Sequence, residues 1–261
     1  MGELVLPVGF LALAVGALAA INTWDYPSYL LLGAAAVFLA SYGGIRRIDR
    51  PMLLRAALWG ALFAVLSYAF FLPYHLRNSA FGAGVHSSLQ QTNILHYIAI
   101  HALFLFIVVS YLIYEARGCI KGALRPLQWL RHKPQALAAQ APTAKGLGRL
   151  SWGLALSLVL ALLYAMAAGY GTVVFLFLLS MVAVVLAMRH LAKGDADAPH
   201  QVFLLVLLLG ALGIGIGVDL VTVEPDIDRM NTVFKLYLEA WVLFGVASAV
   251  MAWRLLTTSL P

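Results

Sequence analysis

The sequence has little charge and almost no cysteine. Only 11% of its 261 residues are Asp, Glu, Lys or Arg, whereas 63% are hydrophobic. A soluble domain has roughly 25% charged residues and about 45–50% apolar residues, so this composition excludes a water-soluble globular protein. The single cysteine, Cys119, excludes an internal disulfide. It follows a predicted helix end, where palmitoylation is chemically allowed, although an inert thiol at the membrane surface is the simpler interpretation.

The sequence also lacks the motifs of several catalytic classes. It contains no G-x-S-x-G nucleophile motif, no H-E-x-x-H zinc motif, no P-loop and no dinucleotide-binding fingerprint. The weak alternation of outer-membrane barrel strands is absent too. Long stretches rich in Leu, Ala, Val and Gly predict instead an all-α integral membrane protein. The glycines Gly213, Gly215 and Gly217 are predicted to allow close helix packing.

Eight apolar stretches approach the ~20 residues that a helix needs to cross a hydrocarbon core of ~30 Å. They lie at about residues 4–21, 28–45, 52–72, 94–115, 150–168, 171–189, 201–220 and 234–255. We therefore predict a single bundle of about eight transmembrane helices over residues 1–261. A basic loop at residues 115–149 would lie on one side, and loops at residues 73–93 and 220–234 on the other.

The Lys and Arg residues predict the orientation of this bundle. All but three of the 17 fall on the side that holds both termini, and the exceptions are Arg77, Arg229 and Lys235. Because cytoplasmic loops carry the Lys/Arg excess, we expect both termini in the cytoplasm. The net charge of +6 then needs no nucleic-acid partner, since a basic loop contacts anionic lipid at most.

The last apolar span begins with a polar stripe on the predicted outer side. Asn231, Lys235 and Glu239 are spaced at i, i+4 and i+8, which places them on one face of a helix. Ionisable groups inside a membrane are costly and mark functional sites. The alternative is a structural ion pair between Lys235 and Glu239.

An acidic segment precedes this span. Glu224, Asp226 and Asp228 alternate, so that in an extended segment their carboxylates would point to one side and hold a divalent cation. The alternative is a solvated acidic loop in which Asp228 caps the following helix.

A second outer segment, residues 22–27, links the first two spans. Trp24, Tyr26 and Tyr29 suit an aromatic belt at the membrane surface, and Pro27 suits the first turn of the next helix. Asp25 lies in a very short link that would hold its carboxylate in place. It is a candidate acid, base or cation partner.

The third outer segment, residues 73–93, carries His75 and Arg77, and its glycines predict a mobile loop over the bundle. Arg77 has a planar guanidinium that matches a phosphate or carboxylate. In the span that follows, His96 and His101 are five residues apart and do not share a helical face. His101 would either hydrogen-bond a neighbouring helix or ligate a haem or pigment.

Residues 22–29 and 228–241 resemble the two signatures of the "YYY" family, poorly characterised membrane proteins found mainly in archaea and Chloroflexi. Members of that family are usually longer, and this chain resembles their C-terminal part. The resemblance implies the plasma membrane of a prokaryote and another membrane chain that supplies the N-terminal part. It also implies distant similarity to GT-C-type glycosyltransferases, which transfer sugars from polyprenyl-phosphate donors at the outer face.

This resemblance predicts an outer-face site for a lipid-linked phosphate or sugar. In that site Asp25 and Glu239 would be the catalytic or orienting carboxylates, and Asp226 and Asp228, with Glu224, would hold a divalent cation. The expected phosphate- and ligand-binding residues are His75, Arg77, Arg229, Asn231, Lys235 and Tyr237. The alternatives are a non-catalytic structural subunit of a larger membrane complex and a haem- or pigment-binding subunit that uses His96 or His101.

Overall fold

The computed structural model describes residues 4–77, 84–132, 144–224, 226–227 and 229–259. Its helices are α1 (Val5–Ile21), α2 (Tyr26–Ile45), α3 (Arg50–Ala69), α4 (Leu72–Arg77), α5 (Ile94–His132), α6 (Ala144–Ala167), α7 (Gly171–Lys193), α8 (Ala198–Leu220) and α9 (Met230–Ser259). Two short strands, β1 (Gly84–Ser87) and β2 (Val221–Glu224), complete the described part of the chain.

Every predicted span coincides with a helix, and the chain is a multi-pass membrane protein. Within the described residues, α2, α3, α7, α8 and α9 and the first part of α5 are each long and apolar enough to cross a bilayer. α1 and the described apolar part of α6, Leu156–Ala167, are shorter apolar helices. The total of eight spans and the orientation of the termini therefore remain predictions. α5 also continues as a helix to His132, beyond the predicted end of its span.

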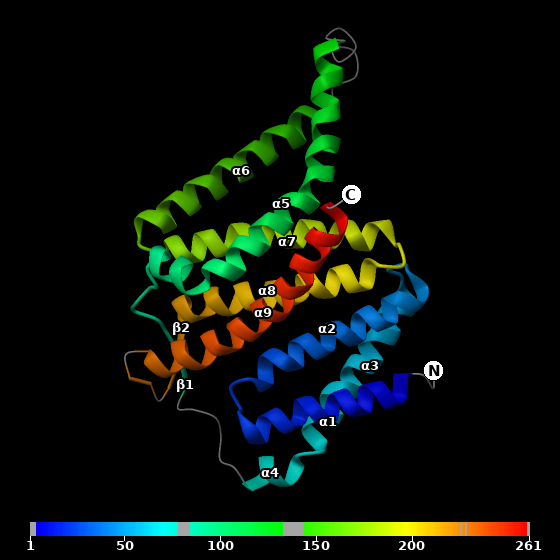
Figure 1. The fold of residues 1–261 in the computed structure, drawn as a ribbon, viewed down its shortest axis with the longest axis vertical. Coiled ribbons are helices and arrows are strands. Elements are labelled where there is room, and N and C mark those ends of the chain that lie inside the picture. The colour runs from blue at the N-terminus through cyan, green and yellow to red at the C-terminus, as the bar shows by residue number, and fades with distance from the viewer. Residues whose placement is uncertain (1–3, 78–83, 133–143, 225, 228, 260–261) are drawn as a thin grey trace.

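The helices form two packed groups, which Figure 1 shows side by side. α1, α2 and α3 pack on one another, α5, α7, α8 and α9 form the second group, and α2 joins the two by packing on α8. Glycines allow the closest approaches in the first group. A Cβ added at Gly16 would lie 2.2 Å from the Ser67 carbonyl oxygen, and one at Gly33 would lie 2.4 Å from the Phe63 ring.

The expected glycine contacts within α8 occur at one of three positions. A Cβ added at Gly215 would lie 2.7 Å from both the Leu176 side chain and the Tyr97 hydroxyl, so close packing there is confirmed. At Gly213 and Gly217 nothing lies within 4 Å, so the packing prediction is wrong for these two. Their missing side chains leave open space instead.

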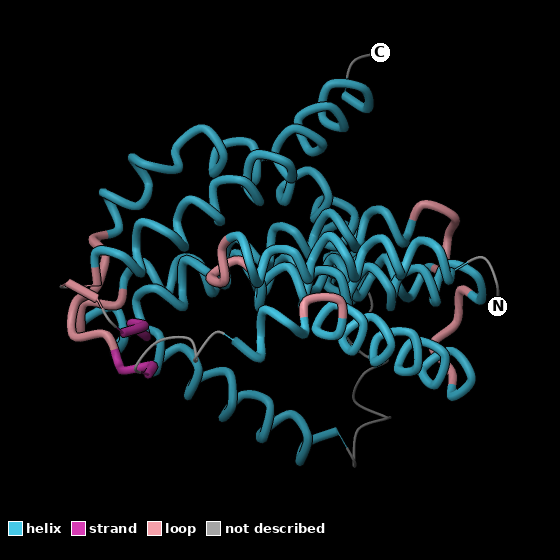
Figure 2. Tube along the Cα trace, turned by 90° about the horizontal axis from the view of Figure 1, so that it is seen from below, coloured by secondary structure: helices cyan, strands magenta, loops and turns pink. Residues whose placement is uncertain are grey.

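The two ends of the bundle carry different links. Figure 1 shows β1, β2, the α1–α2 link and the start of α9 at one end, and the N-terminal end of α1 at the other, and Figure 2 shows the strands and the N-terminus at opposite ends. We call the first of these the strand end. β1 and β2 pair antiparallel, from Gly84 opposite Glu224 to Ser87 opposite Val221. The segments expected as loops at residues 73–93 and 220–234 thus contain a short helix, α4, and a two-stranded pairing, which joins two loops that are far apart in sequence.

Candidate functional site

A buried ion pair lies at the strand end. Asp219, in the last turn of α8, is fully buried, and its Oδ1 lies 3.1 Å from Arg229 Nη1. Thr92 donates its backbone amide and its hydroxyl to the same carboxylate oxygen at 3.0 and 2.6 Å. Because a buried charge is stable only when it is paired and hydrogen-bonded, this arrangement explains how a carboxylate is tolerated at the end of an apolar helix.

Arg229 uses its remaining donors on the segment that precedes α5. Its Nη2 donates to Thr92 Oγ1 at 2.7 Å, and its Nη1 donates to the Gln90 carbonyl oxygen and to Ser88 Oγ. The Tyr237 hydroxyl lies 3.0 Å from Thr92 Oγ1. Since the Thr92 proton is given to Asp219, the Tyr237 hydroxyl donates in that pair. We call Ser88, Thr92, Asp219, Arg229 and Tyr237 the Arg229 cluster.

The Arg229 cluster ties α8, α9 and the segment before α5 together. Arg229 also has a left-handed backbone conformation, with φ of 60°, which this set of contacts holds in place. Both Nη groups of Arg229 already donate to protein groups, and the guanidinium charge is balanced by Asp219. Arg229 and Tyr237, expected as ligand-binding residues, are thus built into the scaffold of this structure.

Asp226 caps α9. Its carboxylate accepts hydrogen bonds from the backbone amides of Ile227, Asn231 and Thr232 at 2.7, 2.7 and 2.8 Å, and from the Thr232 hydroxyl. Desolvation alone would raise the pKa of Asp226, but these hydrogen bonds outweigh it and hold that pKa below its ordinary value. An acidic residue therefore caps α9, and it is Asp226; the predicted cap, Asp228, lies outside the described residues.

The predicted cation site lies only partly within the described residues. The Glu224 side chain and Asp228 lie outside the described residues, and the Asp226 carboxylate is occupied by the cap. Within the described residues no three His, Cys, Asp or Glu side chains are grouped so that they could hold a metal ion. Asn231 contributes its backbone amide to the cap. The divalent cation stays a prediction.

Lys235 lies against the α1–α2 link. Its ammonium nitrogen is 4.6 Å from the centroid of the Trp24 ring, a geometry in which the ring face attracts the cation. Among the described residues, the ion pairs involve other side chains, and none joins Lys235 to Glu239. The structural ion pair considered for this stripe is therefore not formed, and no carboxylate among the described residues lies in ion-pair contact with the Lys235 ammonium.

Glu239 lies one turn further along α9 and is only 4% exposed. Neither of its carboxylate oxygens has a hydrogen-bond partner of ordinary geometry in the described structure. The Ser28 hydroxyl is nonetheless close enough to act as a donor to this carboxylate in a geometry short of an ordinary hydrogen bond, and the Asp25 carboxylate acts on it through its charge. A buried polar group without a partner is destabilising by about 1–3 kcal/mol, and more when it is charged.

Three of the predicted residues therefore come together. Asp25 occupies the position before α2 without a side-chain hydrogen bond to that helix, and it acts on Glu239, while Lys235 lies over the neighbouring Trp24. Pro27 stands in the first turn of α2 as expected. We call Trp24, Asp25, Ser28, Lys235 and Glu239 the α2–α9 site.

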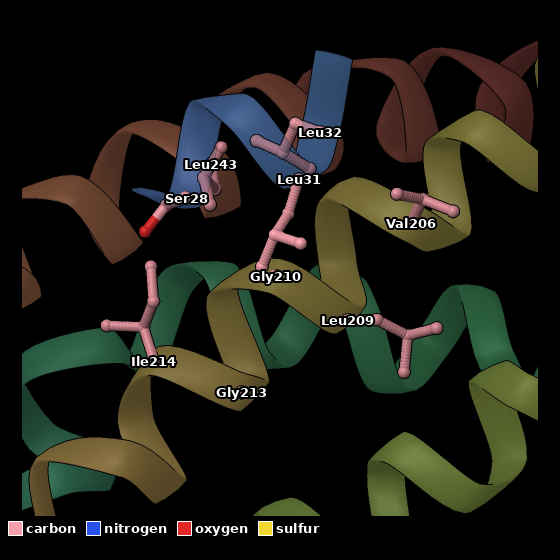
Figure 3. A pocket seen from close by; sticks show the side chains of 9 residues that line it. All are labelled: Ser28, Leu31, Leu32, Val206, Leu209, Gly210, Gly213, Ile214 and Leu243. Atoms are coloured by element: carbon pink, nitrogen blue, oxygen red, sulfur yellow. The ribbon is translucent and has the colours of Figure 1, made fainter. Parts of the chain in front are cut away.

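A cavity adjoins this site. It has a volume of about 410 Å³ and lies between α2, α8 and α9 (Figure 3). Ser28 contributes the polar side chain of its lining, which is otherwise made of leucine, isoleucine, valine and glycine. Leu243, which lines the cavity from α9, stands one helical turn beyond Glu239. Ser28 is thus shared by the cavity and by the surroundings of Glu239.

His75 and Arg77 lie elsewhere, on α4. The His75 ring stacks on Tyr68 with 4.1 Å between centroids and also contacts Tyr26 and Tyr74. Arg77 is exposed in the last turn of this helix. Figure 1 shows α4 below α1, away from β1, β2 and the start of α9. The structure therefore does not bring these two residues to the Arg229 cluster.

The two histidines of α5 have different surroundings. His96 is exposed, whereas His101 is fully buried. His101 Nδ1 lies 3.1 Å from the carbonyl oxygen of Tyr97 in its own helix, so the expected hydrogen bond to a neighbouring helix is wrong. Its ring stacks on Tyr97 at 4.3 Å and is flanked by Tyr237, Trp241 and Phe244. The surroundings of His101 are thus filled by aromatic side chains of the protein.

Comparison with known proteins gives a family. The profile of a family described as "Uncharacterized membrane protein (DUF2298)" matches residues 2–244. The chain belongs to this family. The DUF2298 match extends from α1 into the middle of α9 and includes every residue of the α2–α9 site. No curated protein and no solved structure matches the chain.

Sequence reasoning missed Asp219, Thr92 and Ser28 as site residues. Asp219 carried a usable signal, because an acidic residue in the last turn of an apolar span needs a partner. Thr92 and Ser28 carried none, since a lone hydroxyl near a helix end is most often a local backbone contact. Their importance depends on which helices are neighbours.

Proposed function

We propose that the α2–α9 site binds the anionic head of a lipid-linked phosphate or sugar. In this proposal the chain is a module of a GT-C-like, polyprenyl-phosphate-dependent glycosyltransferase in a prokaryotic plasma membrane, with its strand end on the extracytoplasmic face. One observation carries the proposal. Lys235, a cation without a carboxylate in contact among the described residues, stands one turn from Glu239, a buried carboxylate that has no hydrogen-bond partner of ordinary geometry there.

The depth of Lys235 suits a lipid head. It is the sixth residue of α9, and at a rise of 1.5 Å per residue it lies roughly 8 Å along the helix axis from the first residue. A flexible lysine at this depth reaches the headgroup region and presents its ammonium to a phosphate as a point charge. Arg229 has its charge balanced by Asp219, so Lys235 is the better-placed cation for an anionic ligand.

Glu239 then accepts a donor from the ligand. A sugar or acceptor hydroxyl would donate a hydrogen bond to the carboxylate. A carboxylate within hydrogen-bond reach of the acceptor hydroxyl can take its proton as a general base when that hydroxyl attacks the sugar carbon and displaces the polyprenyl phosphate. Asp25 acts on Glu239 from the α1–α2 link. In this proposal Glu239 is the candidate catalytic base and Asp25 orients it, while Lys235 stabilises the phosphate on which charge develops.

The proposal is tested with Lys235→Met. We expect the variant to lose binding of a polyprenyl phosphate, measured by native mass spectrometry of the detergent-solubilised protein, while its thermal unfolding stays unchanged. Lys193→Met is the matched control, because Lys193 is an exposed lysine in the last turn of α7. Wild-type binding by Lys235→Met, or an equal loss in Lys193→Met, would contradict the proposal.

A second function, that of a non-catalytic subunit of a larger membrane complex, is favoured by α6. This helix packs mainly on α7, and its described face exposes large apolar side chains such as Leu156 and Tyr164, at 60% and 76%. Another membrane chain would fit there. A stoichiometric partner that copurifies with the chain, together with no bound lipid phosphate and no transferase activity, would favour this function over the first.

A further inference from the structure

The cavity beside Ser28 has the form of a slot for a hydrocarbon chain. Its lining runs along α8 from Val206 to Ile214, a distance of roughly 12 Å at 1.5 Å per residue. Leu31 and Leu32 line it from α2, and Leu243 lines it from α9. Figure 3 shows the gap between these three helices. The slot exists because Gly213 of α8 has no side chain to fill it.

The slot is open to the surroundings of the bundle. Gly213 is exposed, and Leu31 is 73% exposed, in the part of α2 and α8 that is apolar enough to lie in a bilayer. A transmembrane helix is too thick to enter it. The cavity volume of about 410 Å³ equals roughly a single turn of a helix 10 Å across with a pitch of 5.4 Å. A linear chain of methylene or isoprene groups is the occupant that fits.

The slot is continuous with the α2–α9 site. Ser28 lines the slot and acts on Glu239, and Leu243 lines it one turn beyond Glu239 on the same face of α9. Along α9, the order is therefore the cation Lys235, the carboxylate Glu239 and then the apolar slot. An amphipathic lipid has the same order, with a charged head followed by an apolar chain.

We infer that the slot between α2, α8 and α9 holds the hydrocarbon chain of the lipid whose anionic head binds at Lys235. This inference rests on the proposed function and adds a chain-binding subsite to it. The subsite makes the protein bind a phosphate with a long chain more tightly than one without a chain, because the chain enters past Gly213 and makes contacts along the slot as far as Val206. Bulk lipid alone would fill the slot without regard to the head.

The test compares two phosphates, a long-chain polyprenyl phosphate and methyl phosphate, which has no chain, with wild type and with Gly213→Leu. A leucine at this position projects into open space, so that the fold is kept and the slot is filled. We expect the variant to bind the long-chain phosphate roughly tenfold more weakly, the loss expected if about ten carbon–carbon contacts are no longer made. Its binding of methyl phosphate should stay as in the wild type, because this phosphate has no chain to enter the slot.

Gly217→Leu is the matched control. Gly217 lies one turn along α8, also has open space around it, and does not line the slot. Wild-type binding by Gly213→Leu, an equal loss in Gly217→Leu, or a wild type that does not distinguish the two phosphates would each overturn the chain-binding subsite. Lys235→Met separates the two proposals, because it should weaken both phosphates. If it weakens neither, the proposed function fails whatever Gly213→Leu does.

Discussion

Two buried carboxylates lie towards the strand end and differ in their ion-pair and hydrogen-bond partners. Asp219 is fully buried, lies 3.1 Å from Arg229 and accepts two hydrogen bonds from Thr92. Glu239 is 4% exposed and lacks a hydrogen-bond partner of ordinary geometry, and its nearest cation on the helix, Lys235, turns to the Trp24 ring instead. Asp219 thus has a counter-ion and hydrogen-bond donors on one oxygen, Oδ1, whereas among the described residues Glu239 has no counter-ion and no donor of ordinary geometry on either oxygen.

This difference separates structure from function. A folded chain gains nothing by burying a carboxylate without partners, and such a group persists where a ligand or a reaction uses it. The Arg229 cluster gives the Asp219 charge a counter-ion and gives Oδ1 hydrogen-bond donors, although Oδ2 has no partner among the described residues, so its removal should unfold the protein. In the α2–α9 site the Glu239 carboxylate and the Lys235 ammonium have no ion-pair partner among the described residues, so removal of these groups should change binding and leave the fold intact.

The largest expected effect on stability follows from breaking the Asp219–Arg229 ion pair. Asp219→Ala leaves the Arg229 guanidinium buried without a counter-charge, and we expect it to lower the free energy of unfolding by about 3–5 kcal/mol. Unfolding in mixed detergent measures this change. Asp195→Ala, at an exposed position between α7 and α8, is the control and should change stability by less than about 0.5 kcal/mol. A similar small effect for Asp219→Ala would remove the distinction between the two carboxylates.

A smaller effect of the opposite sign is expected at the α2–α9 site. Glu239→Leu removes a buried acceptor that has no partner, and we expect the free energy of unfolding of the lipid-free protein to rise by about 1–2 kcal/mol. Glu239→Gln keeps the shape of the side chain and serves as the isosteric comparison. A loss of stability in both variants would show that Glu239 has a structural partner after all.

The smallest effect concerns the cap of α9. Asp226→Ala should lower the free energy of unfolding by about 1 kcal/mol at neutral pH. Because the pKa of Asp226 is lowered in the folded state, its carboxylate stabilises the protein fully above the ordinary Asp pKa of about 3.9. That stabilisation is lost as the pH falls through the lower, folded-state pKa. Unfolding curves of wild type and variant should therefore converge in acid, and a constant difference at all pH values would contradict the cap.

The helices were predictable from the sequence, and the strand end was only partly so. Long apolar runs leave a helix as the one way to satisfy the backbone in a membrane, which is why each predicted span coincides with a helix. The pairing of β1 with β2 was not predicted, since it joins residues 84–87 to residues 221–224, far apart in sequence. Neither short segment carries a sequence pattern that predicts pairing with the other.

The site was predictable at the level of a single helix. The spacing of Lys235 and Glu239 placed both on one face of α9, and the short link placed Asp25 near the membrane surface. Which groups meet across helices was not predictable. Arg229, expected to bind a ligand, pairs with Asp219, whereas Lys235, a candidate ion-pair partner of Glu239, lies over Trp24. Pairing between helices depends on packing that local sequence patterns do not encode.

The most direct test is an electron cryo-microscopy map of the protein in lipid nanodiscs that contain a long-chain polyprenyl phosphate. The account predicts density for the phosphate beside the Lys235 ammonium, with the chain running past Ser28 into the slot at Gly213. Phosphate density at Arg77 or at the Arg229 cluster, with the α2–α9 site empty, would contradict it.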